Sequence, residues 1–405
     1  MKNKKSAVWT AYILTAVIFG LLINGWLNVG QASQAKEHIK VGSRDIILND
    51  KGDSEANKSN LRAGKSSSAA SQSLMSSLKG FFGLGDKTIA LAFTCVSDKV
   101  LFDRIIPDFQ NYWLTKTGKK VNFVTGYALP DFDKMATSVS GKPVQIILMS
   151  SSTNTISRGY TNTKWQETPN KGVVLSYPQV FLVRKGNPKI IKTYADLTIP
   201  GIRVIHVNPL RGTGGGLWQV YGIYGSALKE TELATGNKDR KAATERLQKT
   251  EENAFYEAVE TAVAVKYFLQ GAGDVLIISE AAALKAVKKN DSIELVVPPY
   301  TVINDLAIYK MERNISSSDQ PVIDEFIDYL FTEQSQQAIA EYGFRPSDPT
   351  VLARHPEFKL LDNPFQLAYL GEQTAIKRDV ILDKWLKINN NRTSKANGNG
   401  LSQQP

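Results

Sequence analysis

The 405-residue sequence has little of what builds disulfide-rich or metal-centred proteins. Its one cysteine, Cys95, cannot form a disulfide within the chain, and its three histidines are too far apart for a local zinc motif. We therefore expect no disulfide scaffold, no metal centre and no cofactor. With 42% hydrophobic, 9% aromatic and 22% charged residues, the composition is globular rather than disordered or collagen-like, and the length favours two or three domains.

Basic charge is scarce in the main part of the chain, although the formal net charge is +10. Residues 1–65 carry ten basic against five acidic side chains, and the tail after Trp385 adds three basic residues and no acid. The stretch 87–385 is therefore near +2, too weak for the basic surface that a phosphate backbone requires. We expect no nucleic-acid partner.

An uncharged apolar segment runs from Ala7 to Leu27, close behind three lysines. As a helix its roughly 21 residues would be about 31 Å long, close to the thickness of the hydrocarbon core of a bilayer. We expect residues 1–30 to be a signal peptide or a membrane anchor, and the fair cleavage site at Gly30-Gln31-Ala32 leaves both open. Because the lysines should stay cytoplasmic, the rest of the chain is expected in the periplasm or another extracytoplasmic space.

Two further segments have the composition of unstructured chain. Residues 31–86 are rich in serine, lysine, alanine and glycine, which predicts a flexible linker. About 50 such residues would span about 40 Å, enough to hold a domain off a membrane. The polar stretch 389–405 predicts a disordered tail in the same way.

Between these ends, short β-rich apolar runs alternate with longer helical ones, which predicts a largely parallel α/β fold. About 300 residues of such units exceed most single hydrophobic cores, so we expect two lobes. The expected strands lie near 89–93, 121–124, 145–149, 179–184, 203–207, 274–278, 293–297 and 306–309. The expected helices lie near 101–115, 132–140, 217–228, 262–269, 322–331 and 334–341.

The most informative loop, NPLRGTGGG, runs from Asn208 to Gly216 between a predicted strand and a predicted helix. Its glycines let the backbone turn sharply, and the free N–H groups at the start of the next helix favour an anion. Thr213 adds a hydroxyl donor. The spacing is not that of a P-loop and no lysine follows, which disfavours a nucleoside triphosphate site. A turn that only packs a strand against a helix remains the alternative.

Six segments in order along the chain match one known family. They are VFLVRKGNPK from Val180, YADL from Tyr194, NPLRGTGGGLW from Asn208, GAGDVLIISEAA from Gly271, FRPSDP from Phe344 and FKL from Phe358. Over most of residues 88–388 the chain thus resembles the periplasmic sulfate and thiosulfate binding proteins of ABC importers. The resemblance implies a monomeric type II periplasmic-binding-protein fold of two α/β lobes. Residues 87–178 and 300–388 would form lobe 1, and residues 179–299 lobe 2.

The resemblance also implies a ligand site. Sulfate has no proton to donate at neutral pH, so a selective pocket offers donors only. Thr213, Gly214 and Gly215 match the oxyanion cradle of the family, whereas the segments 126–130 and 261–265 and the position of its pocket tryptophan have changed, so that the pocket could take another solute. The candidate ligand contacts are Gly212, Thr213, Gly214, Gly215, Ser97, Asp98, Ser279 and Arg211.

We therefore expect an exported solute-binding component that captures a small anion, sulfate-like, and delivers it to an ABC permease in the membrane. One alternative is a membrane-tethered sensor or scaffold that kept the fold with an altered or lost pocket. We expect no enzymatic activity, because no set of catalytic residues has local support. Cys95 would be the best nucleophile, and His206 is expected to be a buried strand histidine.

Overall fold

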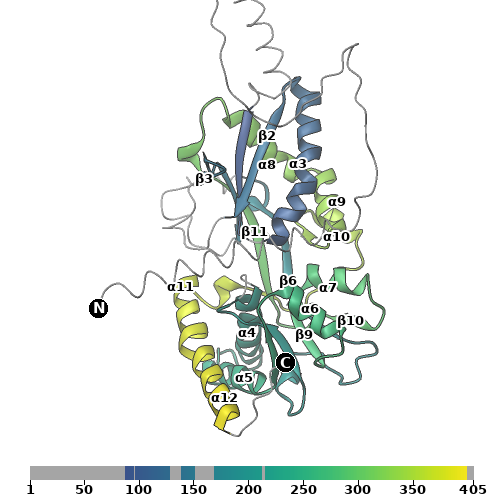
Figure 1. The fold of residues 1–405 in the computed structure, drawn as a ribbon, viewed down its shortest axis with the longest axis vertical. Coiled ribbons are helices and arrows are strands. Elements are labelled where there is room, and N and C mark those ends of the chain that lie inside the picture. The colour runs from purple at the N-terminus through teal and green to yellow at the C-terminus, as the bar shows by residue number, and fades with distance from the viewer. Residues whose placement is uncertain (1–86, 95, 128–137, 151–167, 212–214, 399–405) are drawn as a thin grey trace, which may run out of the picture. The chain divides into compact units, whose positions relative to one another are not determined.

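The computed structural model describes residues 87–94, 96–127, 138–150, 168–211 and 215–398 (Figure 1). The predicted signal peptide or anchor, the predicted linker and Cys95 lie outside the described residues. Within the described part of the chain, no helix is both long and apolar enough to cross a membrane.

The centre of the fold is a sheet of eleven strands with the main order β2-β1-β5-β11-β6-β9-β7-β8. Strands β1, β2 and β5 are parallel to one another, as are β7, β8 and β9, whereas β11 and β6 between them run antiparallel. The main strands are β1 Lys87–Phe93, β2 Val121–Tyr127, β5 Ile146–Ser150, β6 Val173–Arg184, β7 Val204–Val207, β8 Ala254–Ala258, β9 Val275–Ser279 and β11 Val302–Lys310.

Short strands complete the pairing. Strands β10 (Ile293–Val296) and β12 (Arg345–Pro346) pair with β6, and β13 (Phe365–Gln366) pairs with β11. A separate hairpin joins β3 (Ser138–Val139) to β4 (Lys142–Pro143). The described end of the helix predicted at 132–140 is therefore strand, and the rest of that prediction lies outside the described residues.

Strand β6 joins the two halves of the sheet. Through Pro178 it pairs with β11, and from Gln179 onward it pairs with β9. The exchange of partners thus lies between residues 178 and 179. Thr301 donates a hydrogen bond of 2.5 Å to the Gln179 carbonyl, and Asn304 donates one of 2.7 Å to the hydroxyl of Tyr177. These contacts hold β6 beside β11 where both strands pass from one half to the other.

The first half of the sheet is covered by three helices, α3 (Val96–Thr117), α8 (Gln320–Leu330) and α9 (Glu333–Glu341), which Figure 1 shows together near β1 and β2. Their apolar faces share one core with β1, β5 and β11. At its centre, the rings of Phe109 and Phe326 meet edge to face with 4.9 Å between centroids.

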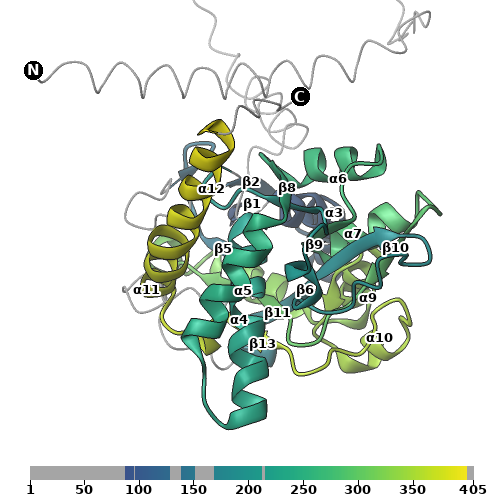
Figure 2. The same cartoon turned by 90° about the horizontal axis from the view of Figure 1, so that it is seen from below.

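The second half of the sheet is covered on both faces. Helices α4 (Gly215–Thr235) and α5 (Arg240–Glu252) pack on one face, and α6 (Thr261–Leu269) and α7 (Glu280–Val287) pack on the other, as Figure 2 shows. Successive residues of a strand point to opposite faces, so β6 serves both cores. Phe181 and Val183 pack in the core beneath α4 and α5, and Val180 and Leu182 pack in the core beneath α6 and α7.

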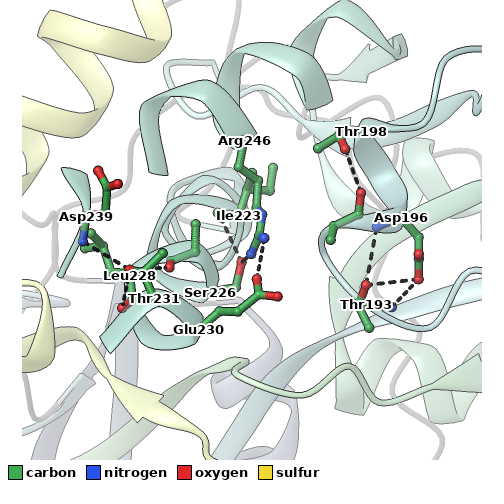
Figure 3. A network of polar contacts seen from close by, with 12 residues as sticks. Thr193, Asp196, Thr198, Ile223, Ser226, Leu228, Glu230, Thr231, Asp239 and Arg246 are labelled. Atoms are coloured by element: carbon green, nitrogen blue, oxygen red, sulfur yellow. Dashed lines mark hydrogen bonds and ion pairs between the residues drawn. The ribbon is translucent and has the colours of Figure 1, made fainter. Parts of the chain in front are cut away.

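Polar contacts fix α5 on α4 (Figure 3). Arg246 of α5 donates hydrogen bonds to Glu230 and, at 3.3 Å, to the hydroxyl of Ser226, both on α4. At the turn between the helices, the Asp239 amide donates to the Thr231 hydroxyl at 3.0 Å. The second half of the helix that follows the glycine loop is thereby held against α5.

The C-terminal segment packs on the second half of the sheet, which differs from its predicted place in lobe 1. After the short helix α11 (Gln373–Ile376), a stretch of π-helix, Lys377–Trp385, enters the core shared with α4 and α5. Helix α12 (Leu386–Gly398) follows without a break. The prediction of disorder from residue 389 is therefore wrong for 389–398, because the polar side chains of Asn389 and Arg392 have partners on β8.

A substitution of Trp385 tests whether the π-helix packs in this core. The side chain is 1% exposed in the core beside α4 and α5, so Trp385→Ala leaves a large cavity. We expect the free energy of unfolding, measured with urea, to fall by about 3 to 5 kcal/mol. Leu382→Ala, in the same π-helix but 42% exposed, should change it by about 0.5 kcal/mol or less. Equal losses in the two variants would contradict this packing.

Candidate functional site

The glycine loop, residues 208–216, begins with a turn built around Asn208 at the end of β7. The side-chain oxygen of Asn208 accepts hydrogen bonds from the amides of Leu210 at 2.9 Å and Arg211 at 3.1 Å. Its Nδ2 donates to Glu257 of β8 at 2.8 Å. Asparagine favours turns because its side chain can bond to backbone groups two or three residues later. The loop therefore leaves the sheet in a fixed direction, with the side chain of Arg211 exposed.

Helix α4 starts at Gly215, and Gly216 touches the end of β7. A Cβ atom on Gly216 would lie 2.4 Å from the carbonyl oxygen of Val207, which is inside van der Waals contact. The amide of Val207 also donates to the side chain of Gln219 at 2.7 Å. Glycine at 216 is thus what lets the start of this 21-residue helix lie against the strand.

The start of helix α6 meets the start of α4. A Cβ atom on Gly215 would lie 3.5 Å from the hydroxyl oxygen of Thr261, the first residue of α6. The first N–H groups of each helix have no partner inside that helix, and the helix dipole makes this end positive. Two helix N-termini and one hydroxyl therefore lie close together, an arrangement suited to an anion.

The other predicted contacts are spread over both halves of the sheet. Gly212, Thr213 and Gly214 lie outside the described residues. Ser279 ends β9, in register with Gln179 of β6. Ser97 and Asp98 lie in the first turn of α3, after β1 in the first half, and Asp98 is fully buried. The structure thus brings Gly215 and Thr261 together. Ser97 and Asp98 follow β1, which is several strands away from β7 in the sheet.

A buried ion pair follows Ser279 directly. Glu280, fully buried in the first turn of α7, accepts hydrogen bonds from Arg345 of β12 at 2.6 and 2.7 Å. Burial raises the pKa of Glu280, while Arg345 acts in the opposite direction. The bidentate contact ties β9 and α7 to the FRPSDP segment. Glu280 is therefore paired within the protein rather than offered as a catalytic acid.

Two surface hollows lie on the first half of the sheet, apart from the glycine loop. One of about 420 Å³ is bordered by α3 and α9 and lined by Asp108 and Lys116, among others. Another of about 500 Å³ lies beside β11 and α8, where Glu312, Asp324 and Asp328 line it. In the second hollow these three carboxylates outnumber the one cation, Lys310, which disfavours an oxyanion there. In the first hollow the charges of Asp108 and Lys116 balance.

Behind the loop, on β7, His206 takes part in a buried charged cluster. Its Nε2 lies 3.4 Å from a carboxylate oxygen of Glu251, and both side chains are fully buried. Burial alone would lower the pKa of His206, but Glu251 and the Val207 carbonyl raise it above the ordinary histidine value. With Glu257 the pair offers three ligand atoms within 4.8 Å of one another. Arg392, however, already contacts Glu257 as the cation of this cluster.

Comparison with known proteins identifies the family. Residues 95–345, more than half of the chain, match the sequence profile described as bacterial extracellular solute-binding protein. The chain belongs to this family. A sulfate-binding protein of Synechococcus elongatus is 28% identical over 295 residues, which cover 70% of this chain and 80% of that protein. A sulfate-binding protein of Synechocystis is 30% identical over 267 residues, which cover 62% and 72%.

Solved structures of solute-binding proteins share the fold. The sulfate-binding protein SubI from Mycobacterium tuberculosis is 25% identical, covers 73% of this chain and 99% of its own, and has a TM-score of 0.57. A Bordetella ferric binding protein, 14% identical with a TM-score of 0.51 over 76% and 99% of the two chains, shows the same fold. These matches confirm the predicted resemblance and the two-lobed α/β fold.

Thr261 is the candidate residue that the sequence does not reveal. The sequence predicts that the segment 261–265 lacks the family's polar donors, yet the structure places the Thr261 hydroxyl beside Gly215. A threonine directly before the apolar run of a helix is a signal for a helix start. That signal predicts the start of helix α6 near Thr261. It does not predict that Gly215 of α4 lies beside it.

A pair of glycine substitutions tests the close approach of α4 to β7. Gly216→Ala places a methyl group against the Val207 carbonyl, and we expect a loss of about 1 to 3 kcal/mol in the free energy of unfolding. Gly215→Ala meets only an ordinary contact at 3.5 Å and should cost about 0.5 kcal/mol or less. Urea unfolding of both variants provides the comparison, and equal costs would speak against the predicted clash.

His206 predicts a dependence of stability on pH. Because its folded-state pKa is raised, its ion pair with Glu251 stabilises the fold fully below the unfolded pKa. This contribution is lost as the pH rises through the folded pKa. The difference in unfolding free energy between the wild type and His206→Gln should therefore be larger at pH 6 than at pH 9. A difference independent of pH would show that His206 is not charged in the fold.

Proposed function

We propose that the protein is the extracytoplasmic solute-binding component of an ABC importer and captures sulfate or a closely related oxyanion. The observation that carries this proposal is the meeting of two helix N-termini, at Gly215 and Thr261, directly after the glycine loop. Its support also includes the sulfate-binding relatives, which match 70% and 62% of this chain. We further propose delivery to a membrane permease by a monomeric protein.

Donor-only chemistry explains why such a site suits sulfate. Sulfate accepts hydrogen bonds with all four oxygens and has no proton to give, so acceptors in its pocket would be left unpaired. Backbone N–H groups at helix starts supply donors together with the positive end of the helix dipole, without a counter-cation. Hydrogen phosphate carries a proton at neutral pH and needs an acceptor as well, so a donor-only pocket disfavours it.

We assign the ligand contacts to the loop and to the strand ends around it. Gly212, Thr213, Gly214 and Gly215 would supply amides and one hydroxyl, with the Thr261 hydroxyl opposite them. Ser97 and Ser279 would supply further donors. Asp98, as a buried carboxylate, would position the start of α3 instead of touching the anion. Arg211 is exposed and would contribute long-range attraction only.

The two lobes would close on the ligand around the strands that join them. We propose that residues 87–178, together with the part of 300–388 that precedes β13, form lobe 1, and that residues 179–299 form lobe 2. The C-terminal part from β13 onward would pack on lobe 2. Strands β6 and β11 are the connections between the lobes. At Gln179, strand β6 exchanges β11 for β9 as its partner, and Thr301, just before β11, is bonded to the Gln179 carbonyl. Contacts from both lobes would favour the closed state.

We also propose that the N-terminal apolar segment exports the chain and is either cleaved or kept as an anchor. The periplasmic or extracytoplasmic location follows from the family and from the three lysines that precede this segment. Sequencing the amino terminus of the mature protein separates the two cases, because a start near Ser33 means cleavage and an intact start in the membrane fraction means an anchor.

Titration calorimetry of the full chain against sulfate, thiosulfate, phosphate and molybdate tests the function. We expect sulfate to bind with one site per chain and phosphate to bind more weakly. Thr261→Val removes one hydroxyl donor with little change in shape, and should weaken sulfate binding about ten-fold. The absence of heat from all four anions would refute oxyanion capture.

A matched control keeps the hydroxyl argument specific. Thr235→Val alters an exposed threonine at the far end of α4, where its hydroxyl bonds only to nearby backbone groups. Sulfate affinity should be unchanged in this variant. Equal weakening in Thr235→Val and Thr261→Val would exclude a direct contact between Thr261 and the ligand.

A further inference from the structure

The C-terminal helix α12 reaches the back of the glycine loop through one carboxylate. On β8, Glu257 accepts a hydrogen bond of 2.6 Å from the side-chain amide of Asn389 and a second from the guanidinium of Arg392. Arg392 also donates to the backbone carbonyl of Ala254 at 2.6 Å. Helix α12 is thus tied to both ends of β8, the strand that borders β7.

The same carboxylate holds the first residue of the loop. The second oxygen of Glu257 accepts the 2.8 Å hydrogen bond from Asn208 Nδ2. This contact leaves the oxygen of the Asn208 side chain free to accept the amides of Leu210 and Arg211. A continuous chain of hydrogen bonds therefore runs from Arg392 through Glu257 and Asn208 to the backbone amides of Leu210 and Arg211.

Arg392 supplies the cation that pairs with Glu257 in this cluster. Glu251 faces His206 instead, and its carboxylate raises the pKa of that histidine. Burial lowers the pKa of Arg392, while Glu251 raises it. Loss of the guanidinium would leave Glu257, which is 12% exposed, with neutral donors only. Its carboxylate would then turn toward water and release Asn208.

We propose that helix α12 positions residues 208–211 at the start of the glycine loop, and that Arg392 is a positioning residue that acts on ligand affinity through Glu257 and Asn208. This proposal rests on the proposed function, because its effect on function is measured as a change in sulfate affinity. A C-terminal segment whose sequence predicts disorder thereby becomes part of the binding apparatus.

Two readouts test the proposal in Arg392→Ala of the full chain. We expect sulfate affinity, measured by titration calorimetry, to fall about ten-fold. We also expect hydrogen exchange at the amides of Leu210 and Arg211, measured without ligand, to become faster. Lys387→Ala removes a positive charge from an exposed position of the same helix and should alter neither readout. Arg392→Gln keeps most of the volume without the charge and serves if the alanine variant does not fold.

A double-mutant cycle separates positioning from general destabilisation. If Arg392 acts through Asn208, Arg392→Ala should weaken sulfate binding little further in an Asn208→Ala background. Additive effects on affinity, or unchanged exchange at Leu210 and Arg211, would overturn the proposal. If the wild type binds no sulfate, the proposed function fails, while the exchange measurement still decides whether α12 orders the loop.

Discussion

The exchange of partners along strand β6 is the constraint on which the whole fold depends. One continuous strand pairs with β11 up to Pro178 and with β9 from Gln179, so each half of the sheet has its own core on a shared backbone. Proline has no N–H to give to a ladder, which suits the point where one pairing ends. Motion between the halves would then concentrate in a few residues of β6 and β11.

The two ends of the glycine loop show how the second half arranges the main chain that the proposed anion site needs. Asn208 turns the chain, Gly216 allows α4 to lie against the Val207 carbonyl, and Thr261 brings a second helix start beside the first. Each step depends on a small side chain or on a side chain that bonds to backbone. A charged ligand residue is unnecessary, because helix N-termini present positive potential and donors together.

Two ion pairs join segments that are far apart in the sequence. Glu280 and Arg345 fasten the end of β9 to β12, and Glu257 and Arg392 fasten β8 to the C-terminal helix. Breaking one partner of a buried pair leaves an uncompensated charge, which costs about 3 to 5 kcal/mol. One pair stands beside Ser279, a candidate ligand contact, and the other bonds to Asn208 at the start of the glycine loop, so in the proposed site both would hold the geometry rather than the ligand.

The sequence alone was sufficient for most of the main strands and helices, for the position of NPLRGTGGG between β7 and α4, and for the resemblance to the family, because these rest on local periodicity and ordered motifs. It did not predict α5 or β8, and it predicted helix where β3 lies. It could not show that Thr261 lies beside Gly215 or that residues 389–398 form a helix. A helix start can be predicted from neighbouring residues, but the element across from it depends on strand order. The polar tail folds because Asn389 and Arg392 find Glu257, a partner more than 130 residues earlier. Only the tertiary structure supplies such a partner.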